Sequence, residues 1–140
     1  MNIYSIPHTG THFVQRLLGV KAKHVEGWKK TDELIILPIR DPWTTYVTWV
    51  SRGRDQDFKE KWFLLNEIYE TQDTLVLPID TKDREMQLSK ISARIGKDLE
   101  TDWKPINNGP RKEVEYIDLS DVYKLPVVDR FYGSKTKAIA

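Results

Sequence analysis

A short polar turn near the beginning of the sequence carries two histidines, two threonines and a glycine. This stretch, His8-Thr9-Gly10-Thr11-His12, follows an apolar run that ends in a proline, and it precedes residues with helical spacing. A turn between a strand and a helix can hold an anion, because the unpaired amides and the dipole at the helix start both favour negative charge. We therefore expect the amides of Gly10, Thr11 and His12 to form an anion cradle. The hydroxyls of Thr9 and Thr11 are expected to add to it, and Gly10 allows the backbone to approach a ligand closely.

A second polar group follows the next apolar run. Arg40 is a fixed cation with a forked set of donors that suits a phosphate. Asp41 and Pro42 are typical of a helix N-cap and first turn, and Thr48 stands two turns into that helix. In an open parallel sheet, ligands bind outside the carboxyl ends of the strands. Either motif alone is also common as a plain turn or cap, but the pair predicts one shared anion site.

The elements that must position these groups alternate between strand and helix. Three apolar runs, 3–6, 34–39 and 75–79, are each followed by polar residues and then by helical spacing. This alternation predicts an α/β fold, a three-layer sandwich with a mainly parallel central sheet. Pro38 and Pro78 interrupt two of the predicted strands and indicate strand ends or bulges. Helices are predicted from the apolar positions Phe13, Leu17 and Leu18; Tyr46, Trp49 and Val50; Phe58, Trp62, Leu65 and Tyr69; Leu88, Ile91 and Ile95.

Composition narrows the function classes. The chain has 140 residues, 39% hydrophobic and 31% charged, with a net charge of +1 and no cysteine. The absence of cysteine excludes disulfides, thiolate metal sites and a cysteine nucleophile. The balanced charge argues against nucleic acid or a membrane as partner, and no apolar run is long enough to span a bilayer. We expect a soluble cytoplasmic protein with one domain over 1–140, in which 101–117 is a loop and 118–140 packs back on the domain.

The two polar groups resemble motifs of the sulfotransferases that use 3′-phosphoadenosine 5′-phosphosulfate (PAPS). Residues 7–13, Pro-His-Thr-Gly-Thr-His-Phe, are similar to the Pro-Lys-Ser-Gly-Thr-Thr-Trp loop that binds the 5′-phosphosulfate in that family. Residues 39–49 are similar to its second motif, in which Arg40 and Thr48 occupy the positions that bind the 3′-phosphate. Residues 75–80 resemble a later strand that ends in an acidic residue. The resemblance spans roughly residues 2–100 in order and spacing and implies a P-loop-type fold.

The resemblance implies PAPS as cofactor and a sulfuryl transfer to a hydroxyl or amine of a small-molecule or glycan acceptor, with no divalent metal. PAPS would be bound by Thr9, Gly10, Thr11, His12, Arg40 and Thr48, with Arg111 standing in a poor match to the family's basic C-terminal loop. His8 replaces the family's loop lysine, so a protonated imidazole would face the leaving oxygen. With an ordinary pKa of about 6.5, that imidazole carries its charge only part of the time at neutral pH.

The proton acceptor and the reaction itself stay open at the level of sequence. His12, His24, Glu26 and Glu67 are candidates for the base that takes the acceptor's proton. One alternative function is a nucleotide or small-molecule kinase on a degraded P-loop, although the Gly-Lys-Ser/Thr ending that such loops need is missing. Another is a catalytically inactive module that binds a nucleotide or a partner. Two features favour it: His8 replaces the family's loop lysine, and the segments that would shape an acceptor pocket in that family are short or absent in this sequence.

Overall fold

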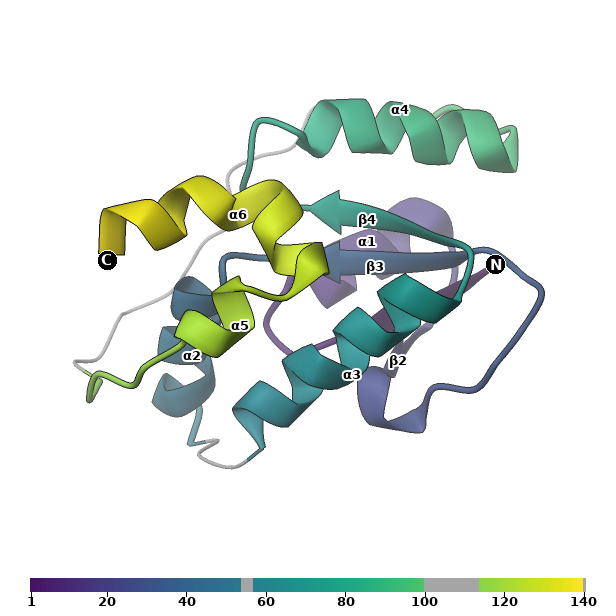
Figure 1. Cartoon of the computed structure of the whole chain (residues 1–140). Coiled ribbons are helices and arrows are strands. Elements are labelled where there is room, and N and C mark those ends of the chain that lie inside the picture. The colour runs from purple at the N-terminus through teal and green to yellow at the C-terminus, as the bar shows by residue number, and fades with distance from the viewer. Residues whose placement is uncertain (54–56, 100–113, 140) are drawn as a thin grey trace.

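A computed structural model describes residues 1–53, 57–99 and 114–139 of the chain (Figure 1). Its elements follow the predicted alternation of strand and helix. In chain order they are β1 (Asn2–Ser5), α1 (Thr11–Leu18), β2 (Ala22–His24), the 3-10 turn η1 (Val25–Gly27), β3 (Ile35–Ile39), α2 (Pro42–Ser51), α3 (Phe58–Thr71), β4 (Thr74–Pro78), α4 (Arg84–Ile95), α5 (Ser120–Tyr123) and α6 (Pro126–Ile139).

The four strands form one parallel sheet in the order β2-β1-β3-β4. The prediction of an α/β fold with a parallel sheet is therefore confirmed. The chain leaves β1 through α1 toward β2 on one side, and it leaves β3 through α2 and α3 toward β4 on the other. The connections that follow β1 and β3 thus depart in opposite directions, which is the point in such a sheet where ligands bind.

Alternate residues of the strands enter two hydrophobic clusters, one on each side of the sheet. Ile3 and Ile36 lie in the cluster that includes residues of α1 and α4. Tyr4, Ile35 and Leu37 lie in the other, which includes residues of α2, α3, α5 and α6. Both faces of the sheet are covered by helices, as all-parallel sheets require. This arrangement is compatible with a three-layer sandwich.

The two strand prolines are accommodated by their places in the sheet. In the described residues, β1 pairs with β3 at Asn2↔Ile35 and Ile3↔Ile36. Pro38 lies beyond this pairing, so the N–H that proline lacks is not needed there. Pro78 belongs to the edge strand β4, and its neighbour Ile79 donates its N–H to the Ile39 carbonyl at 2.9 Å. Backbone nitrogens alternate in direction along a strand, so the nitrogen of Pro78, which carries no hydrogen, points to the open edge of the sheet.

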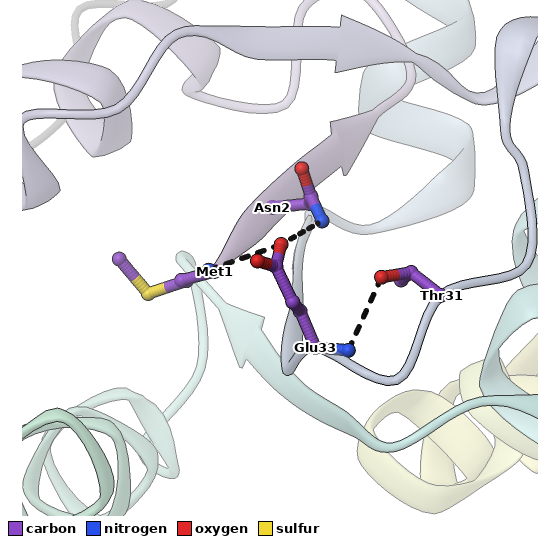
Figure 2. A network of polar contacts seen from close by, with 4 residues as sticks. All are labelled: Met1, Asn2, Thr31 and Glu33. Atoms are coloured by element: carbon purple, nitrogen blue, oxygen red, sulfur yellow. Dashed lines mark hydrogen bonds and ion pairs between the residues drawn. The ribbon is translucent and has the colours of Figure 1, made fainter.

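Polar contacts fix the opposite, amino end of the sheet (Figure 2). The Asn2 side-chain amide donates to Glu33 Oε2 at 2.9 Å, and the amino group of Met1 lies 3.5 Å from the same oxygen. The Glu33 amide donates in turn to Thr31 Oγ1 at 3.1 Å. These contacts hold the start of β1 beside the segment that leads into β3, far from the turns that carry the candidate site.

The C-terminal helices α5 and α6 pack against α3 and the sheet. The apolar side chains of this C-terminal segment enter the cluster shared with α3, and those that are buried are Leu119, Val122, Tyr123, Val127, Val128 and Tyr132. Asn66 of α3 accepts the Val127 amide at 3.1 Å, so a buried side chain caps the start of α6. Most of the loop expected at 101–117 lies outside the described residues, and 114–117 have no regular secondary structure.

One strand, β2, was not predicted from the sequence. β2 has three residues, of which Lys23 and His24 are exposed, and it forms an edge of the sheet. It therefore lacks the apolar run that revealed the other strands.

Within the described ranges, no helix combines the length and the apolar character needed to cross a bilayer.

Candidate functional site

The loop after β1 has a constrained backbone. His8 and Gly10 both adopt positive φ angles, 70° and 77°. Glycine takes this conformation at little cost, whereas a residue with a side chain is strained there. The Thr9 hydroxyl donates to the Ile6 carbonyl at 2.7 Å, and Thr9 is fully buried. The buried Thr9 side chain thus bridges the loop back to the end of the strand segment that precedes it.

Helix α1 begins directly after this loop and turns its amino end toward it. Gly10 is the N-cap residue, and no side chain among the described residues caps the helix there. The first intrahelical bond joins the Val14 amide to the Gly10 carbonyl at 3.1 Å. The amides of the first turn have no partner inside any α-helix. Those of Thr11 and His12 are therefore oriented as an anion-binding end of a helix requires.

Arg40 joins the second motif to the first. Its Nη1 donates to the carbonyl oxygen of His8 at 3.1 Å, although 32 positions separate the two residues in the chain. Arg40 is only 5% exposed, so its charge is held beneath the loop rather than on the surface. The structure therefore brings together the two groups that the sequence predicted to share a site.

The remaining predicted ligands lie as follows. Thr11 Oγ1 donates to Ser5 Oγ at 3.1 Å, and His12 is exposed at the start of α1. Thr48 donates its hydroxyl to the Thr44 carbonyl at 3.3 Å, so that hydrogen is used within α2. Among the described residues, no hydrogen bond joins Thr48 to Arg40 or to the loop. Arg111 lies outside the described residues.

The ring of His8 is half-buried against Trp49 of α2. The two ring centroids are 6.5 Å apart and the planes stand at 89°, an edge-to-face arrangement. Trp49 in turn contacts Phe58 at the start of α3, with centroids 5.5 Å apart. Packing between aromatic rings thus orients the imidazole of His8.

The turn that carries Arg40 is held by groups from three elements. Asp41 caps α2, accepting the Thr44 amide at 3.3 Å, as predicted. The Asp41 amide donates to Asp80 Oδ2 at 3.0 Å, at the end of β4. Tyr123 of α5 donates its hydroxyl to Asp41 Oδ1 at 2.6 Å and accepts the Trp43 amide at 3.2 Å. The backbone on both sides of Asp41 is therefore fixed by side chains.

A second tyrosine completes this arrangement. Tyr132 of α6 donates its hydroxyl to Asp80 Oδ1. We call Asp41, Asp80, Tyr123 and Tyr132 the Asp–Tyr network. Burial, followed by the hydrogen bond to Asp41, raises the pKa of Tyr123. Burial and the neighbouring Asp80 carboxylate likewise raise the pKa of Tyr132. Both phenols stay protonated near neutral pH and can act as donors.

The candidates for a base are spread over the molecule. His12 adjoins the loop, His24 is exposed at the end of β2, and Glu67 is exposed on α3. Glu26, in η1, lies 3.2 Å from Lys61 Nζ. Partial burial alone would raise the pKa of Glu26, but its backbone hydrogen bond and Lys61 together lower it. Of the four, His12 is the one that the chain itself places at the loop.

Sequence reasoning missed the two tyrosines of the network. Asp80, the acidic residue at the end of the segment 75–80, accepts the Asp41 amide and so holds the turn that carries Arg40. Acidic residues at the ends of two adjacent strands were the available signal, since buried carboxylates need donors. No local pattern indicated that the donors would come from the C-terminal helices.

Other features of the described residues lie away from this site. Surface hollows occur beside the end of α4, around Ser92 and Gly96, and between the start of β4 and the segment before β3, around Thr31 and Gln72. Three or more histidine, aspartate or glutamate side chains do not gather into a metal-binding group anywhere in the described ranges.

Comparison with known proteins finds no matching family model, no similar curated protein and no similar solved structure. The site itself offers a helix amino end, a constrained loop that contains His8, and a buried guanidinium bonded to that loop. Together they suit an anion such as a phosphate or a phosphosulfate.

Proposed function

We propose that the chain binds PAPS at the carboxyl ends of β1 and β3 and transfers its sulfuryl group to a hydroxyl or amine of a small acceptor. The observation that supports this most is the hydrogen bond from Arg40 Nη1 to the His8 carbonyl. It unites, at the switch point of the sheet, the two motifs that resemble the sulfotransferase family. In that family the same two motifs bind the two ends of one nucleotide.

In this proposal the backbone holds the phosphosulfate. The amides at the start of α1 face the anion, while the hydroxyls of Thr9 and Thr11 keep the loop in shape through Ile6 and Ser5. Arg40 supplies a fixed positive charge for the 3′-phosphate, and its burial leaves that charge less screened than on the surface. His8, when protonated, stabilises the negative charge that develops on the leaving oxygen.

Sulfuryl transfer makes few further demands on the protein. The acceptor must lie in line with the bond that breaks, and a base must take its proton. We propose His12 as this base, because it adjoins the loop. The proton of the acceptor would pass to its imidazole, and the 3′,5′-bisphosphate of adenosine (PAP) would leave.

A non-catalytic nucleotide-binding module is the second candidate. Arg40 is buried and already donates to a backbone carbonyl, which suits a role in holding the loop. The loop also carries His8 where the family has its lysine. A chain of this kind would bind PAP or PAPS and release no product.

Thermal unfolding with and without ligand tests the proposal. A ligand that binds only the folded state raises the melting temperature by mass action. We expect PAP and PAPS to do so without magnesium, and PAPS to be converted to PAP when a panel of hydroxyl and amine acceptors is added. Binding without turnover would favour the second candidate. Stabilisation by ATP that depends on magnesium would favour a kinase, and no response to any nucleotide would overturn the proposed function.

A further inference from the structure

The Asp–Tyr network connects the C-terminal helices to Arg40. Figure 1 shows α5 and α6 lying beside the carboxyl ends of β3 and β4, where Asp41 and Asp80 stand. Tyr123 is 82 positions from Asp41, and Tyr132 is 52 positions from Asp80. Both tyrosines are almost fully buried, with exposures of 4% and 2%. These hydrogen bonds therefore lie in a water-poor environment, where they act strongly.

Tyr123 and Tyr132 both hold Asp41, the residue after Arg40, but through different hydrogen bonds. Tyr123 holds the Asp41 carboxylate directly at 2.6 Å and also accepts the Trp43 amide. Tyr132 holds the Asp80 carboxylate, whose other oxygen accepts the Asp41 amide at 3.0 Å. The side chain and the amide of Asp41 are thus both fixed. The direction in which Arg40 leaves the backbone follows from the conformation of this turn.

We propose that Tyr123 and Tyr132 are positioning residues. They hold the turn at Asp41 so that the Arg40 guanidinium stays hydrogen-bonded to the His8 carbonyl and is directed toward the bound anion. This inference rests on the proposed function for its effect on nucleotide affinity. The alignment of Arg40 by the two tyrosines does not depend on any ligand. Because burial raises the pKa of both phenols, their donor protons are present throughout the neutral range.

Single hydroxyl deletions test the inference. We would compare Y123F and Y132F with Y4F, since Tyr4 is also a buried tyrosine of the same hydrophobic cluster, 3% exposed. The Tyr4 hydroxyl accepts the Lys29 amide at 3.4 Å and has no bond to the network among the described residues. All three variants lose one hydroxyl, so a general loss of stability affects them alike.

The first measurement is the affinity for PAP, by titration calorimetry well below each melting temperature. We expect Y123F and Y132F to weaken binding roughly tenfold, in line with the loss of one hydrogen bond to a charged group, and Y4F to leave it unchanged. In the background of R40A, Y132F should weaken binding no further, because the two changes act through the same guanidinium. An equal loss with and without Arg40 would overturn the positioning role.

The second measurement needs no ligand. The ¹⁵N–¹H signal of the Arg40 guanidinium, assigned by its absence in R40A, should shift in Y123F and Y132F and stay in place in Y4F. An unchanged signal in both network variants would overturn the inference whatever PAP does. If wild-type protein does not bind PAP while the signal shifts, the proposed function fails and the positioning of Arg40 stands. Should Y132F not fold, Asp80→Asn, which removes one acceptor oxygen at nearly constant volume, replaces it.

Discussion

The guanidinium of Arg40 donates to the backbone carbonyl of His8 at 3.1 Å and so links the turn after β3 to the loop after β1. This hydrogen bond satisfies a backbone acceptor of the loop and brings a positive charge to the same point. Because one side chain joins the loop to a buried charge, its replacement is the most informative single change.

Arg40→Ala is expected to weaken the binding of PAP by ten- to a hundredfold, about the loss of one or two charge-assisted hydrogen bonds. The loss should be larger for PAP than for AMP, since Arg40 is proposed to bind the 3′-phosphate. Titration calorimetry with both nucleotides measures this. Arg94→Ala is the control, because Arg94 is exposed and pairs with Asp73, beside the amino end of β4. Equal losses for PAP and AMP would contradict the assignment of the 3′-phosphate.

Gly10→Ala should destabilise the fold and weaken anion binding together. Gly10 has a φ of 77°, and a side chain in this left-handed region costs about 1–2 kcal/mol. Urea unfolding gives the change in free energy. Gly27→Ala is the matched control, because a Cβ there meets nothing within 4 Å and no positive φ is required. That change is expected to be neutral or stabilising by up to about 1 kcal/mol. Similar losses from both changes would mean that the loop conformation is not the cause.

The sequence allowed the buried strands to be predicted because their signal is local. The run at Ile35–Ile39 is apolar throughout and fully buried, and the Asp-Pro pair marked the start of α2 correctly. β2 could not be predicted, because Lys23 and His24 form a strand only by pairing with Tyr4 and Ser5 of β1. Its identity as a strand comes from tertiary pairing, not from its own residues.

The candidate site could be predicted only in part, for a related reason. The meeting of the loop with Arg40 follows from the parallel sheet, which places the ends of β1 and β3 at one edge. The burial of Arg40 and the inward turn of the Thr9 hydroxyl depend on side-chain packing, which no spacing in the sequence encodes. The same is true of the tyrosines that bond to Asp41 and Asp80 from the C-terminal helices.

Alkaline pH should destabilise the protein through Tyr123 and Tyr132. Burial and the adjacent carboxylates raise the pKa of both phenols above the ordinary value of 10.0. The unfolded chain therefore loses these protons first, so the free energy of unfolding falls as the pH rises above about 10. Below that pH the stabilisation is complete. Urea unfolding from pH 8 to 11 should show a shallower fall for the double variant Y123F/Y132F, and parallel curves for the two proteins would contradict this explanation.

Asn66→Ala should weaken the docking of α6 on α3. Asn66 is 8% exposed, and its side-chain oxygen accepts the Val127 amide at 3.1 Å. Removal of the Asn66 side chain therefore leaves the Val127 N–H without that acceptor. The expected cost is about 1–3 kcal/mol by urea unfolding. Glu67→Ala, at the next position and exposed to solvent, should change stability by less than about 0.5 kcal/mol. A large effect of Glu67→Ala on turnover with unchanged stability would instead restore Glu67 as a candidate base.

His8→Lys tests whether the loop histidine acts as the cation at the leaving oxygen. An imidazole is only partly protonated at neutral pH, whereas lysine is fully charged there. If His8 has the proposed role, wild-type release of PAP from PAPS should fall as the imidazole loses its proton. The variant should release PAP several-fold faster near pH 8 and hold its rate as the pH rises further. Because the position already has a φ of 70°, the backbone strain is similar for both residues. His24→Lys adds the same charge at the exposed end of β2 and should leave the rate unchanged. A slower His8→Lys that still binds PAP as tightly as wild type would show that the charge at position 8 does not assist the leaving group.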